Sequence, residues 1–310
     1  MKAGQSLQGF SHFVASRQGL YAVNENKWAC LVLGQFFGLA LRNQALYAFE
    51  TRDAPRLPSY QGRIMRFSLE GSELGPGETL VAGLDNGCHQ IDFMEGRLQV
   101  VDTYQQQIID FTPDFSSYEL HHPLPQAARN DWAGGYAHCN SLLGFNDFRL
   151  LLLHNGGVKT RRPSLLLVCN REWKPIRQAL LPGLGCHNIV LLEDGCLLSC
   201  ASPAGSMIDM QGSRFKVDEC MTRGVAVGDA ELVIGASHFA VREDRRLVPG
   251  RVHFFERNGE RRASLELPAA PTDIRRIDGQ DLGLSNYAGD RLSQYSLTHF
   301  SGRHWQRCSR

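Results

Sequence analysis

The sequence predicts an all-β protein, and within that class a β-propeller of six blades. Similar short stretches around His89, His138 and His187 recur at intervals of 49 residues. A fixed repeat of about 40 to 50 residues built from short strands is typical of four-stranded propeller blades. In addition, no run of about 12 residues has helical periodicity. Five or seven blades are the alternative counts.

The central repeats share one pattern, in which a polar residue precedes a short apolar strand, a turn and a second apolar strand. The stretches 89–102 and 187–200 show it in full, and 138–155 is a third copy with a longer turn. Turn residues between two aliphatic runs favour β-hairpins. Each copy is therefore predicted to form the two inner strands of a blade, with its histidine at the mouth of a central channel.

Weaker copies extend the series and place Phe37, Arg223 and Asp273 at the mouth of three further blades. Successive mouth positions are then separated by 52, 49, 49, 36 and 50 residues, and the interval of 36 requires a blade with short outer loops. The last copy pairs 273–277 with 282–285. Outer strands are expected at 62–68, 164–168, 252–256 and 262–267.

The N-terminal stretch also fits the hairpin pattern, at 11–15 and 19–24, but the next copy begins only 25 residues later, counted from His12 to Phe37. It is either a truncated seventh blade or the part that completes the ring by pairing with C-terminal strands around 291–297. Joining the two ends would remove open sheet edges. We therefore expect one propeller domain over 1–310, closed by its N-terminal strands.

The composition excludes several classes of protein. A formal charge of +1, from 33 basic and 32 acidic residues, gives no bias toward nucleic acid or an anionic membrane. No apolar run is long enough for a transmembrane helix, and the N-terminus does not resemble a signal peptide. Nine cysteines without a Cys-x-x-Cys pair fit a reducing compartment. A cytoplasmic protein is expected, and Cys88, Cys139 and Cys186 are expected to be buried.

Strand geometry predicts which residues of each repeat gather at the rim of the channel. Because the second strand of each hairpin returns to the mouth, residues about 13 to 17 positions after the mouth residue come back to the rim. The rim is predicted to collect His89, His138, His187, Arg223 and Asp273. A second tier behind it is predicted to contain Asp102, His154, His238 and Tyr287.

Imidazoles gathered on one rim indicate a metal site, because three nitrogen ligands with open positions are typical of catalytic centres. We expect His89, His138 and His187 to bind one divalent transition metal, which is zinc, iron, copper or manganese, while second-tier groups orient the rings. Tyr136 shares the strand parity of His138 and is a candidate acid or base. Arg223 is a candidate for binding a carboxylate or phosphate.

Such a site predicts a metal-dependent enzyme that acts on a small polar or anionic metabolite by lyase or hydrolase chemistry, with oxygen-dependent chemistry at iron or copper as the second reading. Three other interpretations remain open. The histidines could bind an organic ligand directly, or duplication could have copied a structural histidine. A non-catalytic propeller would instead bind a protein through rim residues such as Tyr118, Trp132 and the Arg161–Arg162 pair.

With the repeat laid out, the chain resembles the six-bladed propellers of the NHL, gluconolactonase and strictosidine-synthase type. Histidines at the start of inner strands are also similar to the lyase domain of peptidylglycine alpha-amidating enzymes, which holds zinc by three histidines beside Tyr, Arg and Asp residues. The resemblance implies that His89, His138 and His187 are ligands and that Tyr136, Arg223 and Asp273 are auxiliaries. Carotenoid-cleaving oxygenases, with iron on histidines around a propeller axis, offer the alternative analogy.

Overall fold

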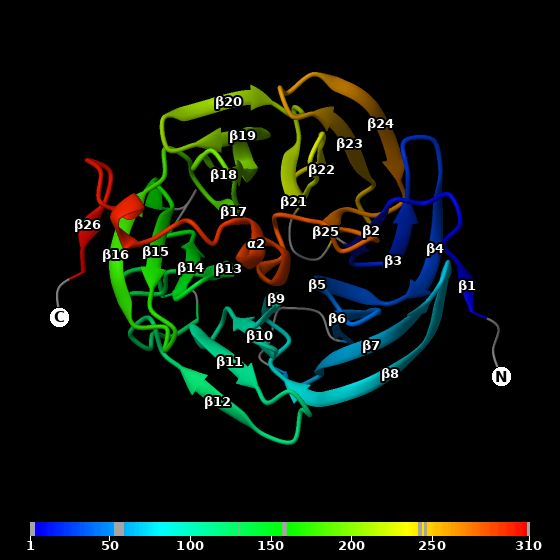
Figure 1. Cartoon of the computed structure of the whole chain (residues 1–310), viewed down its shortest axis with the longest axis horizontal. Coiled ribbons are helices and arrows are strands. Elements are labelled where there is room, and N and C mark those ends of the chain that lie inside the picture. The colour runs from blue at the N-terminus through cyan, green and yellow to red at the C-terminus, as the bar shows by residue number, and fades with distance from the viewer. Residues whose placement is uncertain are drawn as a thin grey trace.

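The computed structural model describes residues 4–52, 59–129, 131–156, 160–240, 244 and 247–308. Over these residues the strands form six antiparallel sheets arranged in a ring (Figure 1). Neighbouring inner strands contact one another all the way round, from β5 through β9, β13, β17, β21 and β25 and back to β5. The predicted six-bladed β-propeller is confirmed.

Blades 1 to 3 follow one another along the chain. Blade 1 contains β5 (Gln35–Arg42), β6 (Ala45–Thr51), β7 (Gly62–Glu70) and β8 (Glu73–Leu84), with β1 (Gln5–Ser6) at its edge. Blade 2 contains β9 (Cys88–Met94), β10 (Arg97–Asp102), β11 (Gln107–Phe111) and β12 (Tyr118–His121). Blade 3 contains β13 (Cys139–Phe145), β14 (Phe148–Leu153), β15 (Leu165–Cys169) and β16 (Pro175–Leu180), with β26 (Gln306–Arg307) at its edge.

Blades 4 and 5 continue the same order. Blade 4 contains β17 (Cys186–Leu191), β18 (Leu197–Ala201), β19 (Ser206–Asp209) and β20 (Gly212–Lys216), and a 3-10 turn over Ser202–Ala204 connects its middle strands. Its outer strands and turns are short, which accounts for the interval of 36 residues in the sequence. Blade 5 contains β21 (Met221–Val227), β22 (Glu231–Ser237), β23 (Gly250–Glu256) and β24 (Arg261–Leu267).

Blade 6 joins the two ends of the chain. Its inner strand β25 (Pro271–Arg276) pairs with β2 (His12–Ser16), and β3 (Gly19–Val23) and β4 (Trp28–Leu33) follow outward. The N-terminal strands thus complete the ring, but the predicted partner around 291–297 is wrong. The predicted strand at 282–285 is also wrong, because β2 already fills the hydrogen-bonding edge of β25 that such a strand would need.

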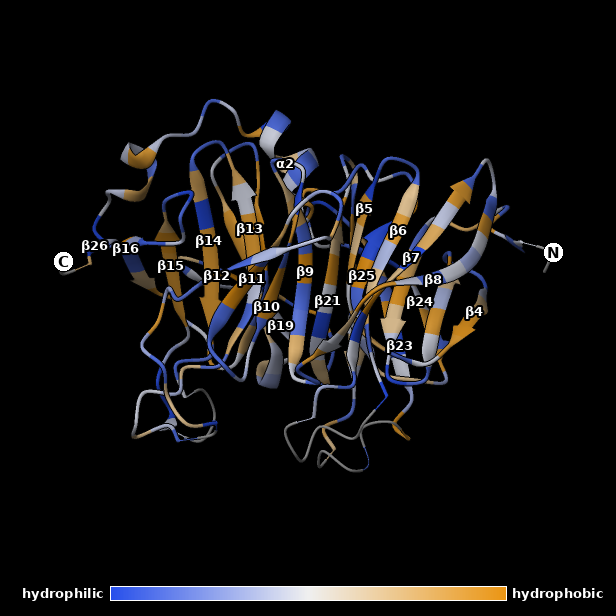
Figure 2. Ribbon diagram, turned by 90° about the horizontal axis from the view of Figure 1, so that it is seen from below, coloured by the Kyte–Doolittle hydropathy of each residue, from blue (hydrophilic) through white to orange (hydrophobic). Residues whose placement is uncertain are grey.

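The residues after β25 form the short helix α2 (Ser285–Arg291) and a 3-10 turn over Leu297–Phe300. Helix α2 lies over one end of the channel, and β13 runs toward it from the opposite end (Figures 1 and 2). Its first residue anchors it there: Asp92 of β9 accepts hydrogen bonds from the Ser285 N–H and hydroxyl, and Ser285 Oγ accepts one from Gly144 N–H. No helix among the described residues is long and apolar enough to span a membrane.

Apolar side chains fill the seams between neighbouring blades. Val190 and Leu198 of blade 4 pack against Val225 and Leu232 of blade 5, for example, in one continuous buried cluster. Cys88, Cys139 and Cys186 are buried as predicted. Burial also raises the pKa of Cys186 to about 11, so that thiol is a small apolar group at neutral pH.

An extra residue sits in the inner strand of every blade, close to the mouth opposite α2. The strand registers skip at 36–39, 88–91, 139–141, 187–190, 222–225 and 271–273, where each inner strand carries one residue more than its partner. A β-bulge of this kind bends the strand and re-aims its side chains. The bulges place polar residues of the inner strands at the channel mouth.

Candidate functional site

Four histidines meet at the channel mouth, and they come from three neighbouring blades. His89 lies in β9, His138 directly precedes β13, His154 directly follows β14, and His187 lies in β17. The ligand nitrogens of His138, His154 and His187 all lie within 4.8 Å of one another. The His89 ring lies 5.2 Å from the His138 ring, measured between centroids. His154, predicted behind the rim, is therefore part of the cluster itself.

The predicted common register of the three rim histidines does not hold in blade 3. Cys88, Cys139 and Cys186 occupy equivalent buried positions on the three inner strands. His89 and His187 follow their cysteines, whereas His138 precedes Cys139. His138 reaches the mouth through a left-handed backbone conformation, with φ of 55°. That residue is outside the regular strand, which frees its ring to stack on His154, 4.2 Å away between centroids.

Hydrogen bonds at Nδ1 orient three of the rings. The His89 Nδ1 lies 2.7 Å from the Gly87 carbonyl oxygen, and the His187 Nδ1 lies 3.0 Å from that of Gly185. Because a carbonyl oxygen can only accept, these contacts place the proton on Nδ1 and the lone pair on Nε2. This is the tautomer in which Nε2 can bind a metal ion.

Hydroxyl groups complete the support of the same nitrogens. Thr103 Oγ1 lies 2.9 Å from His89 Nδ1, Tyr136 Oη 2.9 Å from His138 Nδ1, and Ser202 Oγ 2.8 Å from His187 Nδ1. Thr103 and Ser202 stand at the predicted return distance from their histidines, but sequence reasoning selected Asp102 instead. The Asp102 carboxylate faces Gln107 and the Gln105 N–H, and burial raises its pKa to about 6.

The cluster is cationic on one side. Arg223 of β21 places Nη2 at 2.6 Å from His187 Nε2, so it is at the mouth as predicted. Burial, and then the charge of Arg223, hold the pKa of His187 well below its usual value. His187 is consequently a neutral imidazole that accepts a hydrogen bond at Nε2.

The remaining predicted residues lie outside the cluster. His238 follows β22 and lies at the mouth, where its Nδ1 is 3.4 Å from Cys220 Sγ. Tyr287 does not reach the rim, because it is on helix α2 at the other end of the channel and contacts Arg291 there. Tyr136 is buried, and its hydroxyl touches His138 rather than the cavity's centre.

Asp273 lies one layer below the rim in a belt of polar groups that joins the inner strands. Members of the belt accept hydrogen bonds from backbone N–H groups of the next blade: Gln90 from Leu142, Asn188 from Gly224 and Asp273 from Leu39. Asp273 also lies 3.1 Å from Nη1 of the buried Arg275. These contacts place the Asp273 carboxylate between strands below the rim. Thr272 is the bulge residue of β25 and lies at the mouth.

The cluster opens into a cavity of about 710 Å³. Its wall includes all four histidines, His238, Arg17 and Arg223, a set of apolar side chains and Glu219, whose carboxylate is paired with Lys216. Arg17 is in the hairpin between β2 and β3, and sequence reasoning did not find it because blade 6 is assembled from both ends of the chain. Trp132, predicted as a protein-binding residue, lines this cavity, whereas Tyr118 is exposed on the outer strand β12.

The donor set fits a metal ion. Two imidazole nitrogens bound to one tetrahedral ion at about 2.0–2.1 Å stand about 3.3 to 3.4 Å apart. His154 Nε2 and His187 Nε2 are separated by 3.2 Å. The structure therefore contains a group of three histidines that could hold a metal, with His89 beside it.

No protein-family model matches the chain, and no curated protein matches it in sequence. Several solved structures are similar in fold. They include a chain of the nidogen/laminin complex (TM-score 0.61, 8% identity, 87% of this chain and 99% of that chain), a putative gluconolactonase (0.54, 12%, 86% and 84%) and a streptogramin B lyase (0.50, 11%, 89% and 94%). At these identities the likeness establishes the propeller fold alone.

Proposed function

We propose that the protein is an enzyme that binds one divalent transition metal through His138, His154 and His187 and acts on an anionic substrate. The observation that carries the proposal is the convergence of three imidazoles within 4.8 Å in the wall of a cavity. Imidazole ligands suit zinc, iron, copper and nickel. A ligand set of three nitrogens leaves a coordination position for substrate or water, which is the arrangement of a catalytic rather than a structural site.

Different residues of the chain would position the metal ligands and bind the substrate. The hydroxyls of Tyr136 and Ser202 hold the rings of His138 and His187 in place. Arg223 stays protonated and positively charged at neutral pH. It would bind the carboxylate or phosphate of the substrate next to the cluster. A bound metal would polarise a substrate oxygen or lower the pKa of a bound water to about 7. We expect lyase or hydrolase chemistry at such a site.

One observation favours a second candidate function, in which the histidines bind an organic anion without a metal. Arg223 Nη2 lies 2.6 Å from His187 Nε2, and a cation so close to a ligand nitrogen opposes a second cation. In the metal-dependent enzyme, Arg223 must therefore move onto the substrate's anionic group. In the alternative, His154, His187 and Arg223 would all bind the same anion.

Metal analysis separates the two candidates. We expect untagged protein to carry close to one transition metal ion per chain by mass spectrometry, and the triple variant His138→Ala/His154→Ala/His187→Ala to carry none. The matched control is a triple variant at exposed histidines, His122→Ala/His299→Ala/His304→Ala, which should keep its metal. Folded wild-type protein that neither contains metal nor takes up added zinc, iron or copper would contradict the proposal.

Single substitutions then identify the ligands. The His154→Ala variant should lose metal, whereas His89→Ala should weaken binding less, because His89 lies outside the group that is within 4.8 Å. The reverse order would restore the ligand set His89, His138 and His187 that the sequence predicts. Iron or copper in place of zinc would direct the search to oxygen-dependent chemistry.

A further inference from the structure

The channel mouth has two sides, one with clustered imidazoles and one with arginine side chains. Blades 2 to 4 supply the four clustered imidazoles, and blades 5 and 6 supply Arg223 and Arg17 as well as His238. Both guanidinium groups also border a small hollow next to the main cavity, together with Thr272. The Arg17 Cζ atom lies 5.2 Å from the centroid of the Phe37 ring, and Arg223 Nη2 lies 2.6 Å from His187 Nε2, so each guanidinium group contacts a residue of the cavity wall. Guanidinium groups beside a cavity attract an anionic group and can bind its oxygens in bidentate fashion.

Aromatic rings border the same two sides. The Phe37 ring lies 6.0 Å from the His89 ring, and the Trp132 ring 6.2 Å from the His138 ring, between centroids. Tyr104 and Phe239 line the cavity as well. Phe239 is 73% exposed, so an aromatic side chain stands in solvent at the cavity's edge. Together with Phe37, Tyr104 and Trp132 it gives the cavity an aromatic wall, which is typical of sites that bind organic ligands.

The size of the cavity agrees with an extended ligand. A small carboxylate would fill little of 710 Å³, a volume in the range that encloses drug-sized ligands with mostly apolar walls and a few polar anchors. The imidazoles and arginines supply polar anchors, beside Asn86, Ser202 and Glu219, and apolar side chains also line the wall.

We infer that the substrate is an amphiphilic anion: a carboxylate or phosphate held by Arg17 and Arg223 beside the imidazoles, attached to an aromatic or alkyl body that packs on Phe37, Trp132 and Phe239. The inference rests on the proposed function, because it names the substrate class of the same site. It names a larger ligand than the small polar or anionic metabolite that the sequence predicts. The anionic group is adjacent to the metal ligands, and the apolar body extends toward the cavity's edge.

Binding of matched probes tests this inference. Isothermal titration calorimetry would compare 4-phenylbutanoate with butanoate, which lacks the ring, and with 4-phenyl-1-butanol, which lacks the charge. We expect 4-phenylbutanoate to bind at least tenfold more tightly than either. 3-Phenylpropyl phosphate serves as the phosphate probe, and the tighter of the two anions identifies the head group. Equal affinity for butanoate and 4-phenylbutanoate, or for the alcohol and the acid, would overturn the inference.

Variants assign the two halves of the ligand to the two parts of the site. Arg223→Gln should weaken 4-phenylbutanoate at least tenfold and leave the alcohol unchanged. Phe239→Ser, at a position too exposed to affect folding, should weaken 4-phenylbutanoate about fivefold and leave butanoate unchanged. Tyr118→Ser is the matched control, since Tyr118 is 58% exposed on the outer strand β12. Loss of affinity in this control equal to that of Phe239→Ser would also overturn the inference.

Titrations of both metal-free and zinc-loaded protein keep the two proposals distinguishable. Tight binding of 4-phenylbutanoate by protein that never takes up metal would retain the amphiphilic anion and refute the metal site. One bound metal per chain without preference for 4-phenylbutanoate would retain the metal site and refute the amphiphilic substrate.

Discussion

Every imidazole nitrogen that faces away from the cavity in His89, His138 and His187 has a hydroxyl partner. Tyr136 provides it for His138, at 2.9 Å, and is itself 2% exposed, so its ring is fixed by packing. Outer partners of this kind orient a metal-binding imidazole, and their loss typically lowers metal affinity by about 10 to 100-fold. We therefore expect Tyr136 to act as a positioning residue of the proposed site, whereas the sequence predicted an acid or base.

The variant Tyr136→Phe tests that role because it removes one oxygen and keeps the ring. We expect zinc affinity, measured by competition with a chromophoric chelator, to fall by about tenfold, with little change in the thermal midpoint. Tyr118→Phe, on the outer strand, should match wild type. Unchanged zinc affinity in Tyr136→Phe would mean that packing alone orients His138.

Single residues also show what the sequence can and cannot predict about the site. The spacing of 49 residues correctly predicted that His89, His138 and His187 lie at one mouth of the channel. It did not reveal that His138 precedes its cysteine, because the repeat was aligned on histidines rather than on the buried Cys88, Cys139 and Cys186. It also could not show whether Thr103 or Asp102 faces His89, since neighbouring residues of a strand point to opposite faces.

The hairpins and bulges of the inner strands determine which side chains lie at the channel mouth. The hairpins were predictable from apolar runs separated by turns, whereas the bulges were not, because a bulge changes hydrogen-bond pairing without a fixed sequence signature. Each bulge shifts the parity of the strand. All six inner strands share this bulge, so it does not set Asp273 apart from the histidines. Asp273 lies one layer below them, beside Arg275, because it is equivalent to Gln90 and Asn188, and Thr272 occupies the histidine position.

Gly38 tests how closely the inner strands approach at these bulges. A Cβ atom there would lie 2.5 Å from the His89 carbonyl oxygen and 2.7 Å from the Ile91 nitrogen, both backbone atoms of the next blade. We expect Gly38→Ala to lower the free energy of unfolding by about 1 to 3 kcal/mol, as overpacking does, in chemical denaturation. Gly289→Ala is the control: no atom lies within 4 Å of its Cβ position in helix α2, so stability should be kept or slightly raised.

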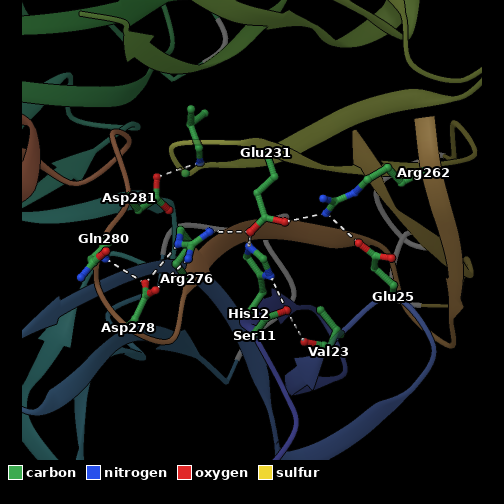
Figure 3. Close-up of polar contacts among 12 residues, drawn as sticks. Ser11, His12, Val23, Glu25, Glu231, Arg262, Arg276, Asp278, Gln280 and Asp281 are labelled. Carbon is green, nitrogen blue, oxygen red and sulfur yellow. Dashed lines mark hydrogen bonds and ion pairs between the residues drawn. The ribbon is translucent and has the colours of Figure 1, made fainter. Parts of the chain in front are cut away.

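The whole molecule depends on the seam where β2 and β25 join the two ends of the chain. His12 of β2 is fully buried in this seam, 3.6 Å from Glu231 of blade 5 (Figure 3). Glu231 is already paired with Arg276 at 2.5 Å and with Arg262 at 2.8 Å. Its carboxylate therefore does little to stabilise a charge on His12. The sequence predicted that the N-terminal strands close the ring, but it did not predict that they pair with β25. The sequence of 271–276 is equally consistent with the first strand of a separate blade.

Burial of this histidine predicts how the stability of the ring depends on pH. Desolvation, followed by the charges of Arg276 and Arg262 and opposed by that of Asp278, lowers the pKa of His12 from 6.5 to about 3. The unfolded chain therefore binds more protons than the folded chain between these two pH values. The contribution of neutral His12 to stability is complete above pH 6.5 and is lost progressively as the pH falls toward 3.

Chemical denaturation of the wild type and of His12→Asn over about pH 5 to 8 isolates this contribution, because proton binding at other groups common to both proteins cancels in the difference. The difference in the free energy of unfolding should be constant above pH 6.5. Below it, the wild type should lose about 1.4 kcal/mol per pH unit relative to the variant, the free energy that corresponds to one pKa unit. A difference that stays constant down to pH 5 would show that the folded ring admits a proton on His12 near its usual pKa, and that the closing seam opens to water.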